Sequence, residues 1–194
     1  MTVSIPSADQ CAAVAVDVQP GLLKAYPVGR ARRVVDSARF AVSVLRALDV
    51  PLALLSLDPE RLGPVAGAVE EAAGPGAARI PKGAYDAWRE PAFRAWVAAV
   101  ERPWVVLFGI ETHVCVLQTA FSLLEVGFRV AWLRDAIDSR DDTDRGTGER
   151  LLERAGALPL TTETLAFATL RGRDHPAFPK ILSLLKQRVE AGRP

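Results

Sequence analysis

The chain has 194 residues, a length typical of one domain, and 49% of them are hydrophobic, enough to form a full core. Lysine and arginine total 24 against 23 for aspartate and glutamate, a formal net charge of +1, and the arginines do not gather in one basic run. This balance gives no electrostatic reason to expect nucleic acid or an acidic membrane surface as a partner.

Strand-like and helical patterns alternate along the whole chain. Short apolar runs bounded by turn residues predict six strands, at 11–18, 51–57, 77–81, 104–110, 128–133 and 157–160. Apolar residues at helical spacing predict a helix after Gly29 and further helices at 65–73, 91–100, 112–126, 142–156, 162–170 and 179–190. The alternation indicates one α/β domain over residues 1–194, with helices on both faces of a mostly parallel sheet.

Two of these helices bear on packing and assembly. The helix at 112–126 is apolar on nearly every face, so we expect it to be buried. The last helix carries one apolar stripe, formed by Ile181, Leu184, Leu185 and Val189. Part of that stripe can pack on the chain's own sheet, but the other helices already suffice to cover both faces. We therefore expect a homo-oligomer, at least a dimer.

The start of the chain shows no secretory signal pattern, and no apolar stretch reaches membrane-spanning length. The two cysteines, Cys11 and Cys115, lie far apart and form no C-x-x-C pair. We expect a cytoplasmic protein without disulfides and without a membrane-bound segment.

Three reactive side chains stand at the carboxyl ends of predicted strands, the edge at which parallel sheets bind ligands. Asp17 closes the first strand, Lys82 follows the third, and Cys115 follows the fourth at a helix start. A helix start and a nearby ammonium group both favour a thiolate, and a carboxylate can accept the thiol proton. Together they would supply a nucleophile, a base and a cation.

Each of these residues also has a purely structural interpretation. Cys115 can be a small buried hydrophobe, Asp17 can bind the turn before Pro20, and Lys82 can be a solvated surface residue. Their combination at one edge is what favours catalysis. Cys11 lies at the start of the first strand, away from that edge, and is interpreted as a structural residue.

The segments around these residues resemble the isochorismatase-like cysteine hydrolases. VDVQ resembles that family's opening Asp-x-Gln, IPKGAYDAW its lysine segment, and VVLFGIETHVCVLQTAFSLLEVG its nucleophile region. Three further stretches, LDPERLGP, LRDAIDSRDDTDR and RDHPAFPKI, resemble the isochorismatase domain-containing proteins within the family. The likeness covers nearly the whole chain.

The resemblance implies specific roles. Asp17, Lys82 and Cys115 would form the catalytic triad of a hydrolase that cleaves an amide-type C–N bond of a small molecule through a thioester. The bond between Ile110 and Glu111 would be cis, and the backbone N–H groups of Glu111 and Cys115 would form the oxyanion hole. The sheet would have the order 3-2-1-4-5-6, which brings the ends of strands one and four together.

The sequence departs from the metal-binding members of that family, which use an aspartate and two histidines after the second strand. The corresponding segment here contains Asp58 but no histidine, so we expect no metal and no other cofactor. His113 either supports the site or is structural. Tyr85 and Trp88 either line an apolar pocket or pack in the core. The alternative function is a catalytically silent binding or scaffold protein that retains the fold.

Overall fold

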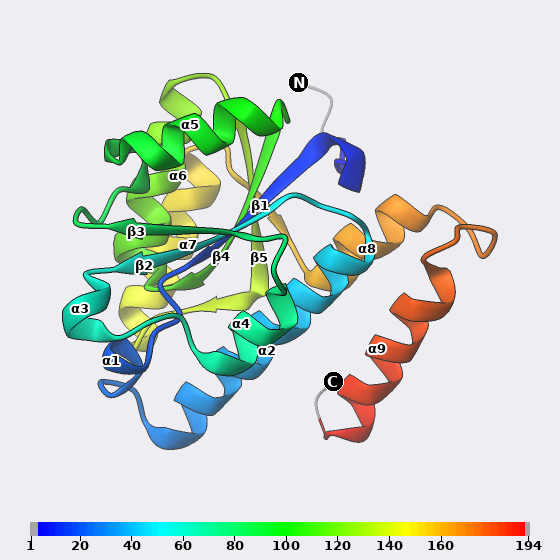
Figure 1. Ribbon diagram of the computed structural model, residues 1–194, viewed down its shortest axis with the longest axis horizontal. Helices are drawn as coiled ribbons and strands as arrows, with labels where there is room; N and C mark the ends of the chain where they lie inside the picture. Colours follow the sequence, from blue (N-terminus) through cyan, green and yellow to red (C-terminus); the bar gives the residue numbers. More distant parts are fainter. Residues whose placement is uncertain (1–3, 193–194) are drawn as a thin grey trace.

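The computed structural model describes residues 4–192, and its strands form one parallel sheet (Figure 1). These strands are β1 (Cys11–Val16), β2 (Leu52–Leu57), β3 (Ala78–Lys82), β4 (Trp104–Ile110), β5 (Arg129–Asp138) and β6 (Leu158–Leu160). Their order is β3-β2-β1-β4-β5-β6, and each neighbouring pair is parallel. The predicted α/β architecture and strand order are confirmed.

Helices cover both faces of the sheet (Figure 1). The α-helices are α1 (Pro20–Leu23), α2 (Val28–Ala47), α3 (Pro59–Leu62), α4 (Gly67–Ala73), α5 (Pro91–Val100), α6 (Leu117–Glu125), α7 (Asp142–Arg154), α8 (Thr162–Leu170) and α9 (Phe178–Glu190). Shorter turns are η1 (Ala8–Gln10), η2 (Ala87–Arg89) and the π-helical η3 (Thr112–Val116). Long α2 packs on one face with α4, α8 and α9, whereas α5, α6 and α7 cover the other. Within residues 4–192, no helix combines the length and apolarity that a membrane span requires.

The two central strands, β1 and β4, meet at an unusually close approach. Every residue of both strands is buried, as expected for a parallel sheet covered on both faces. Gly109 in β4 has a φ of 112° and pairs with Val16 of β1. A Cβ at this position would lie 2.1 Å from the Val16 carbonyl oxygen. Glycine is therefore required at position 109. The residue that it pairs with on β1 directly precedes Asp17.

The region after β4 differs from the sequence prediction. Instead of one helix buried all round, η3 leads into α6, and α6 packs on β5 and α7 with one face only. The side chains of Phe121 and Val126 are 42% and 48% exposed. The expectation of a fully buried helix is wrong, because α6 belongs to the outer layer.

Strand β5 also runs further than predicted, through Asp138 instead of ending at 133. The charged residues in this extension are paired. Asp135 accepts hydrogen bonds from the backbone and hydroxyl of Thr162 and lies 2.9 Å from Nη1 of Arg188. The Arg30 guanidinium binds both carboxylate oxygens of Asp138.

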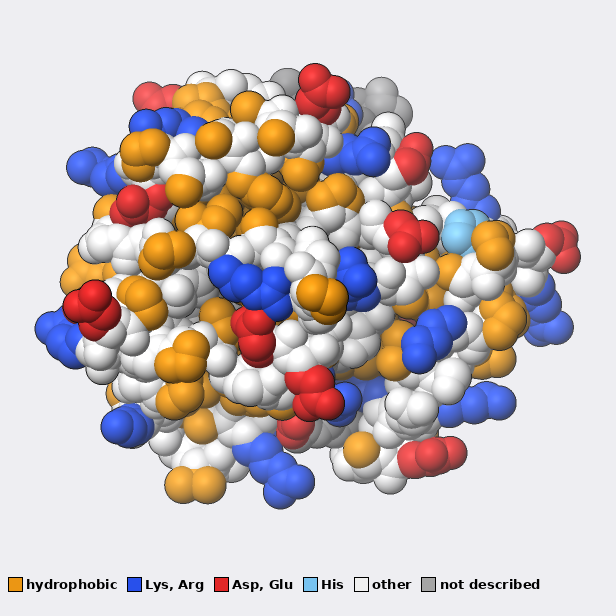
Figure 2. All heavy atoms as spheres, in the orientation of Figure 1, with side chains coloured by type: hydrophobic (Ala, Val, Ile, Leu, Met, Phe, Trp, Pro, Cys, Tyr) orange, Lys and Arg blue, Asp and Glu red, His pale blue; other side chains and the backbone are white. Residues whose placement is uncertain are grey.

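The C-terminal helix α9 packs against α2. Its Ile181 is buried, and Leu184 and Leu185 pack partly buried against the core, while Val189 is exposed. The chain's own surface therefore covers three of the four residues of the predicted apolar stripe. On the face shown in Figure 2, acidic and basic side chains are interspersed with hydrophobic ones and form no single-sign patch.

Candidate active site

Asp17 lies directly after β1, where the order of the strands reverses. Its side chain is fully buried, and its backbone has a φ of 51°, a left-handed conformation that few residues other than glycine adopt. The Asp17 N–H donates to the carbonyl of Leu55 in β2. Among residues 4–192, no protein donor in good geometry reaches Oδ1 of the carboxylate. The same holds for Oδ2, which lies beside the Lys82 ammonium. The carboxylate also interacts with the Cys115 thiol.

Gln19 holds the end of β1 against the end of β2. Its side-chain Oε1 accepts from the Leu57 N–H at 2.8 Å, and its Nε2 donates to the carbonyls of Leu57 and Gly63. The side chain is completely buried. Gln19 belongs to the VDVQ segment, but no role for it is predicted from the sequence. The available signal was a long polar side chain in an otherwise apolar segment.

Lys82 is the last residue of β3, whereas the sequence analysis placed it just after the strand. Its side chain is fully buried, and Nζ lies 2.7 Å from Oδ2 of Asp17. Nζ also donates to the carbonyls of Ala84 at 3.0 Å and Tyr85 at 3.3 Å. These contacts satisfy the ammonium group and hold it beside the carboxylate, as a buried ion pair requires.

Cys115 is buried in η3 and interacts with both members of this pair. Burial, together with the charge of Asp17, raises the pKa of its thiol to about 12, and Lys82 opposes the rise. Lys82 lowers this pKa as expected, but burial and the charge of Asp17 outweigh it, so the net shift of the thiol pKa is upward. Burial also raises the pKa of Asp17, with Lys82 again opposing.

A cavity of about 260 Å³ opens onto Cys115. Most of its lining comes from segments at the carboxyl edge of the sheet, and it consists of Leu22, Leu57, Arg61, Leu62, Tyr85, Glu111, Val114, Cys115 and Arg140. The peptide bond between Ile110 and Glu111 is cis. Asp17 and Lys82 lie beneath this lining and contribute no wall of their own.

The three residues considered for the pocket occupy different environments in the structure. Tyr85 lines the cavity and is exposed. Trp88 does not line it, because its ring packs edge-on against Phe93 and Phe128, so the core interpretation holds. His113 also lies outside the lining, with Nδ1 2.9 Å from the Ser139 hydroxyl. Neither Trp88 nor His113 therefore lines this cavity.

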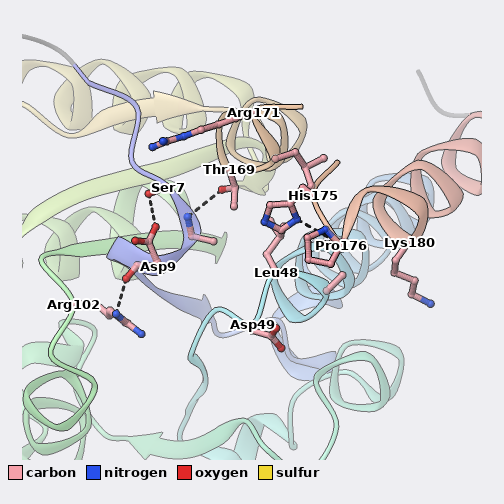
Figure 3. Close-up of a pocket in the computed structure, with 14 residues that line it drawn as sticks. Ser7, Asp9, Leu48, Asp49, Arg102, Thr169, Arg171, His175, Pro176 and Lys180 are labelled. Atoms are coloured by element: carbon pink, nitrogen blue, oxygen red, sulfur yellow. Dashed lines mark hydrogen bonds between the residues drawn. The ribbon is translucent and has the colours of Figure 1, made fainter. Parts of the chain in front are cut away.

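A larger cavity, about 810 Å³, lies at the opposite, amino edge of the sheet (Figure 3). Figure 3 shows Arg102 donating to the Asp9 carbonyl and Ser7 bound to the Asp9 carboxylate, with His175 across the opening. Cys11 does not line this cavity. Its thiol donates to the Ser7 carbonyl at 3.3 Å, and burial raises its pKa to about 12.

Ligating side chains do not gather elsewhere. Within the described part of the chain, no group of three histidine, cysteine, aspartate or glutamate side chains is arranged to hold a metal ion. Asp58, the aspartate that follows the second strand, pairs with Nε of Arg61 at 3.1 Å.

Comparisons with known proteins agree with this fold. The sequence profile of the Isochorismatase domain matches residues 11–164. Bovine isochorismatase domain-containing protein 2 is 35% identical over 159 residues, which span 80% of this chain and 74% of the relative. A structure described as MAR1 ribonuclease from Caenorhabditis elegans superposes with a TM-score of 0.87 at 27% identity, covering 94% of this chain and 93% of the other. The Escherichia coli ycaC gene product, described as an octameric hydrolase of unknown specificity, superposes with a TM-score of 0.83 at 21% identity, over 98% and 99%.

Proposed function

The chain belongs to the isochorismatase family, and on that premise we propose that it is a metal-independent cysteine hydrolase of small amides. The observation that carries the proposal is the fully buried Asp17–Lys82 pair, 2.7 Å apart, in contact with Cys115 beneath a small cavity. Burying two charges costs several kcal/mol for each ion before pairing. Such a pair beside a thiol is typical of a catalytic site.

The first chemical step depends on Asp17 as a base. A thiol with a pKa of about 12 is almost entirely protonated near neutral pH, so the nucleophile is not a preformed thiolate. The proton passes from Sγ of Cys115 to the Asp17 carboxylate as sulfur attacks the amide carbonyl carbon. The raised pKa of Asp17 makes it a stronger base than an exposed carboxylate. Lys82 keeps a positive charge beside the pair throughout.

The remaining steps return the site to its starting state. The backbone N–H groups of Glu111 and Cys115 stabilise the oxyanion of the tetrahedral intermediate. The C–N bond then breaks, and the amine leaves with the proton held by Asp17. Asp17 next takes a proton from water, whose oxygen attacks the thioester. The C–S bond breaks, the carboxylic acid is released, and the Cys115 thiol regains its proton.

The dimensions of the cavity support a small substrate. Its volume of about 260 Å³ is below the range of roughly 300–1,000 Å³ usual for drug-sized ligands. A ribonuclease is named among the structural relatives, but the reactive groups here lie under this cavity, and the net charge is only +1. These features favour a small molecule over RNA.

Ammonia release from a panel of small primary amides tests the proposal, with Cys115→Ala protein as the matched blank. We expect at least one amide to be hydrolysed by the wild type and none by the variant. An RNA oligonucleotide belongs in the same panel. Cleavage of RNA alone, or equal ligand binding by both proteins without any turnover, would instead favour a nuclease or a scaffold.

Assembly into a homo-oligomer is part of the same proposal. The exposed Phe121 and Val126 at α6 offer apolar surface for a second copy, and the E. coli relative is described as octameric. Light scattering coupled to size exclusion should give a mass of at least two chains. A mass near 20.9 kDa, that of one chain, would contradict this part.

A further inference from the structure

We propose that the substrate carries a carboxylate in addition to its scissile amide, and that Arg61 and Arg140 hold this carboxylate. The inference rests on the proposed hydrolysis at Cys115 and specifies the class of molecule that the cavity accepts. Its basis is the charge, exposure and placement of these two arginines.

The two arginines approach the cavity from opposite sides of the sheet's centre. Arg61 belongs to α3, which follows β2, and Arg140 follows the end of β5. In the order β3-β2-β1-β4-β5-β6, β2 and β5 flank the central pair that carries Asp17 and leads to Cys115. Both arginines therefore line the same cavity as Cys115.

The charge that the cavity presents to a ligand is positive. The side chains of Arg61 and Arg140 are 77% and 52% exposed. Glu111 is the sole acidic residue among the lining side chains, and its side chain is only 9% exposed. Its carboxylate accepts the Arg140 backbone N–H and lies 3.1 Å from Nη1 of Arg140. Asp58, the partner of Arg61, is outside the lining.

Each guanidinium keeps donors for a ligand. A guanidinium has five N–H donors in a planar fork that matches a carboxylate. The Arg61–Asp58 contact is made through Nε and the Arg140–Glu111 contact through Nη1. Both terminal nitrogens of Arg61 and Nη2 of Arg140 are therefore left for a substrate oxygen. Lys82 is not an alternative partner, because its ammonium is buried and bound to Asp17 and two carbonyls.

The rest of the lining limits what joins the two functional groups. Leu22, Leu57, Leu62 and Val114 supply apolar surface, and the whole cavity is about 260 Å³. A short aliphatic segment between amide and carboxylate matches that surface and volume. The substrate class is thus a compact aliphatic acid that bears an amide.

Competing alkylation of Cys115 tests this charge preference without any need for turnover. Iodoacetate and iodoacetamide have nearly the same shape and leaving group but differ by one negative charge. Peptide mass spectrometry gives the rate of Cys115 alkylation by iodoacetate divided by the rate with iodoacetamide. The same ratio measured with 2-mercaptoethanol gives the value for a free thiol. We expect the Cys115 ratio to exceed the free-thiol ratio by about tenfold, the scale of one charge-assisted contact.

Variants assign the preference to the arginines. Arg61→Gln should lower the ratio at least threefold, whereas Arg154→Gln, which removes the same charge from an exposed position on α7, should leave it unchanged. Arg140→Lys keeps a charge beside Glu111 but loses the fork, and should lower the ratio less. A wild-type ratio equal to that of the free thiol, or one insensitive to Arg61→Gln, would overturn the inference.

A binding measurement covers the case in which Cys115 resists alkylation. Calorimetry on Cys115→Ala protein should show succinamate binding about tenfold more tightly than succinamide, with the difference lost when Arg61→Gln is added. Equal affinities would overturn the inference.

Failure of the proposed function has a different signature, namely amide turnover that survives Cys115→Ala. Cys115-dependent turnover of neutral amides only would overturn the substrate class and leave the hydrolase intact.

Discussion

At the carboxyl edge of the sheet, Cys115 lies against a buried carboxylate and ammonium beneath a cavity of about 260 Å³. At the amino edge, Cys11 binds a backbone carbonyl near a cavity of about 810 Å³. Both thiols are buried, and burial raises the pKa of each to about 12. The two edges thus differ in neighbours, not in thiol acidity.

The contrast shows which features identify a site in this molecule. At the larger cavity, the exposed Asp9 carboxylate accepts a hydrogen bond from the Ser7 hydroxyl, and Arg102 donates to the Asp9 backbone carbonyl. The smaller cavity lies above a charge pair that the fold has removed from water at a cost. A buried carboxylate beside the thiol is therefore the distinguishing feature, and neither the cavity volume nor the thiol pKa reveals it.

Substituting the two cysteines separately should give the largest difference. Cys115→Ala should lower kcat for an amide substrate at least about a thousandfold, because the nucleophile is lost. Cys11→Ala should leave kcat within about twofold and reduce the free energy of unfolding by about 1 kcal/mol, the cost of a small cavity. Steady-state kinetics with parallel denaturant unfolding measure both. Comparable activity losses in the two variants would end the functional distinction between the edges.

Replacing one glycine near each edge of the sheet sharpens the comparison, because the two substitutions should differ in their effect on the free energy of unfolding. Gly109→Ala places a Cβ 2.1 Å from the Val16 carbonyl oxygen in a backbone with positive φ, so it should destabilise the fold by about 3 kcal/mol or more. Gly172→Ala, in a loop bordering the amino edge, meets no atom within 4 Å and should change stability by less than about 0.5 kcal/mol. Chemical denaturation reports both values. If Gly109→Ala left the free energy of unfolding unchanged, the close approach of β1 and β4 would be refuted.

The pKa values of two aspartates should lie on opposite sides of the usual carboxyl range. Burial raises the pKa of Asp17, whereas the Ser7 hydrogen bond, aided by Arg102, lowers the pKa of exposed Asp9. Because the deprotonated form of Asp17 is the active one, acidification should reduce kcat/KM at a higher pH than an ordinary carboxylate would dictate. Carbon-13 titration of the two carboxyl groups, compared with the pH profile, checks this. An acidic limb that follows Asp9 would be inconsistent with Asp17 as the base.

Much of the fold follows from local pattern. The strand at 104–110 and the helices at 91–100 and 162–170 have the predicted bounds, because proline, turn or capping residues mark their ends. The end of β5 was missed because Arg134 and Asp135 look like the end of a strand. Only the folded chain reveals that Asp135 is paired with Arg188, 53 positions away.

The candidate site was predictable as a set of residues but not as an environment. Their positions after strands one, three and four placed Asp17, Lys82 and Cys115 at one edge, and the structure brings them together. The direction of the thiol pKa shift was not predictable, because it depends on how completely water is excluded. The same holds for Gln19, whose role depends on strand ends that are far apart in sequence.

Rapid acid quench during turnover, followed by peptide mass spectrometry, tests the central claim most directly. During hydrolysis of an identified amide, Cys115 should carry the mass of the substrate's acyl group as an acid-stable, hydroxylamine-labile thioester, and Cys11 should remain unmodified. The acyl group should be absent from Cys115→Ala protein. Continued turnover by that variant, or an acyl group found on Cys11 alone, would contradict nucleophilic catalysis at the carboxyl edge of the sheet.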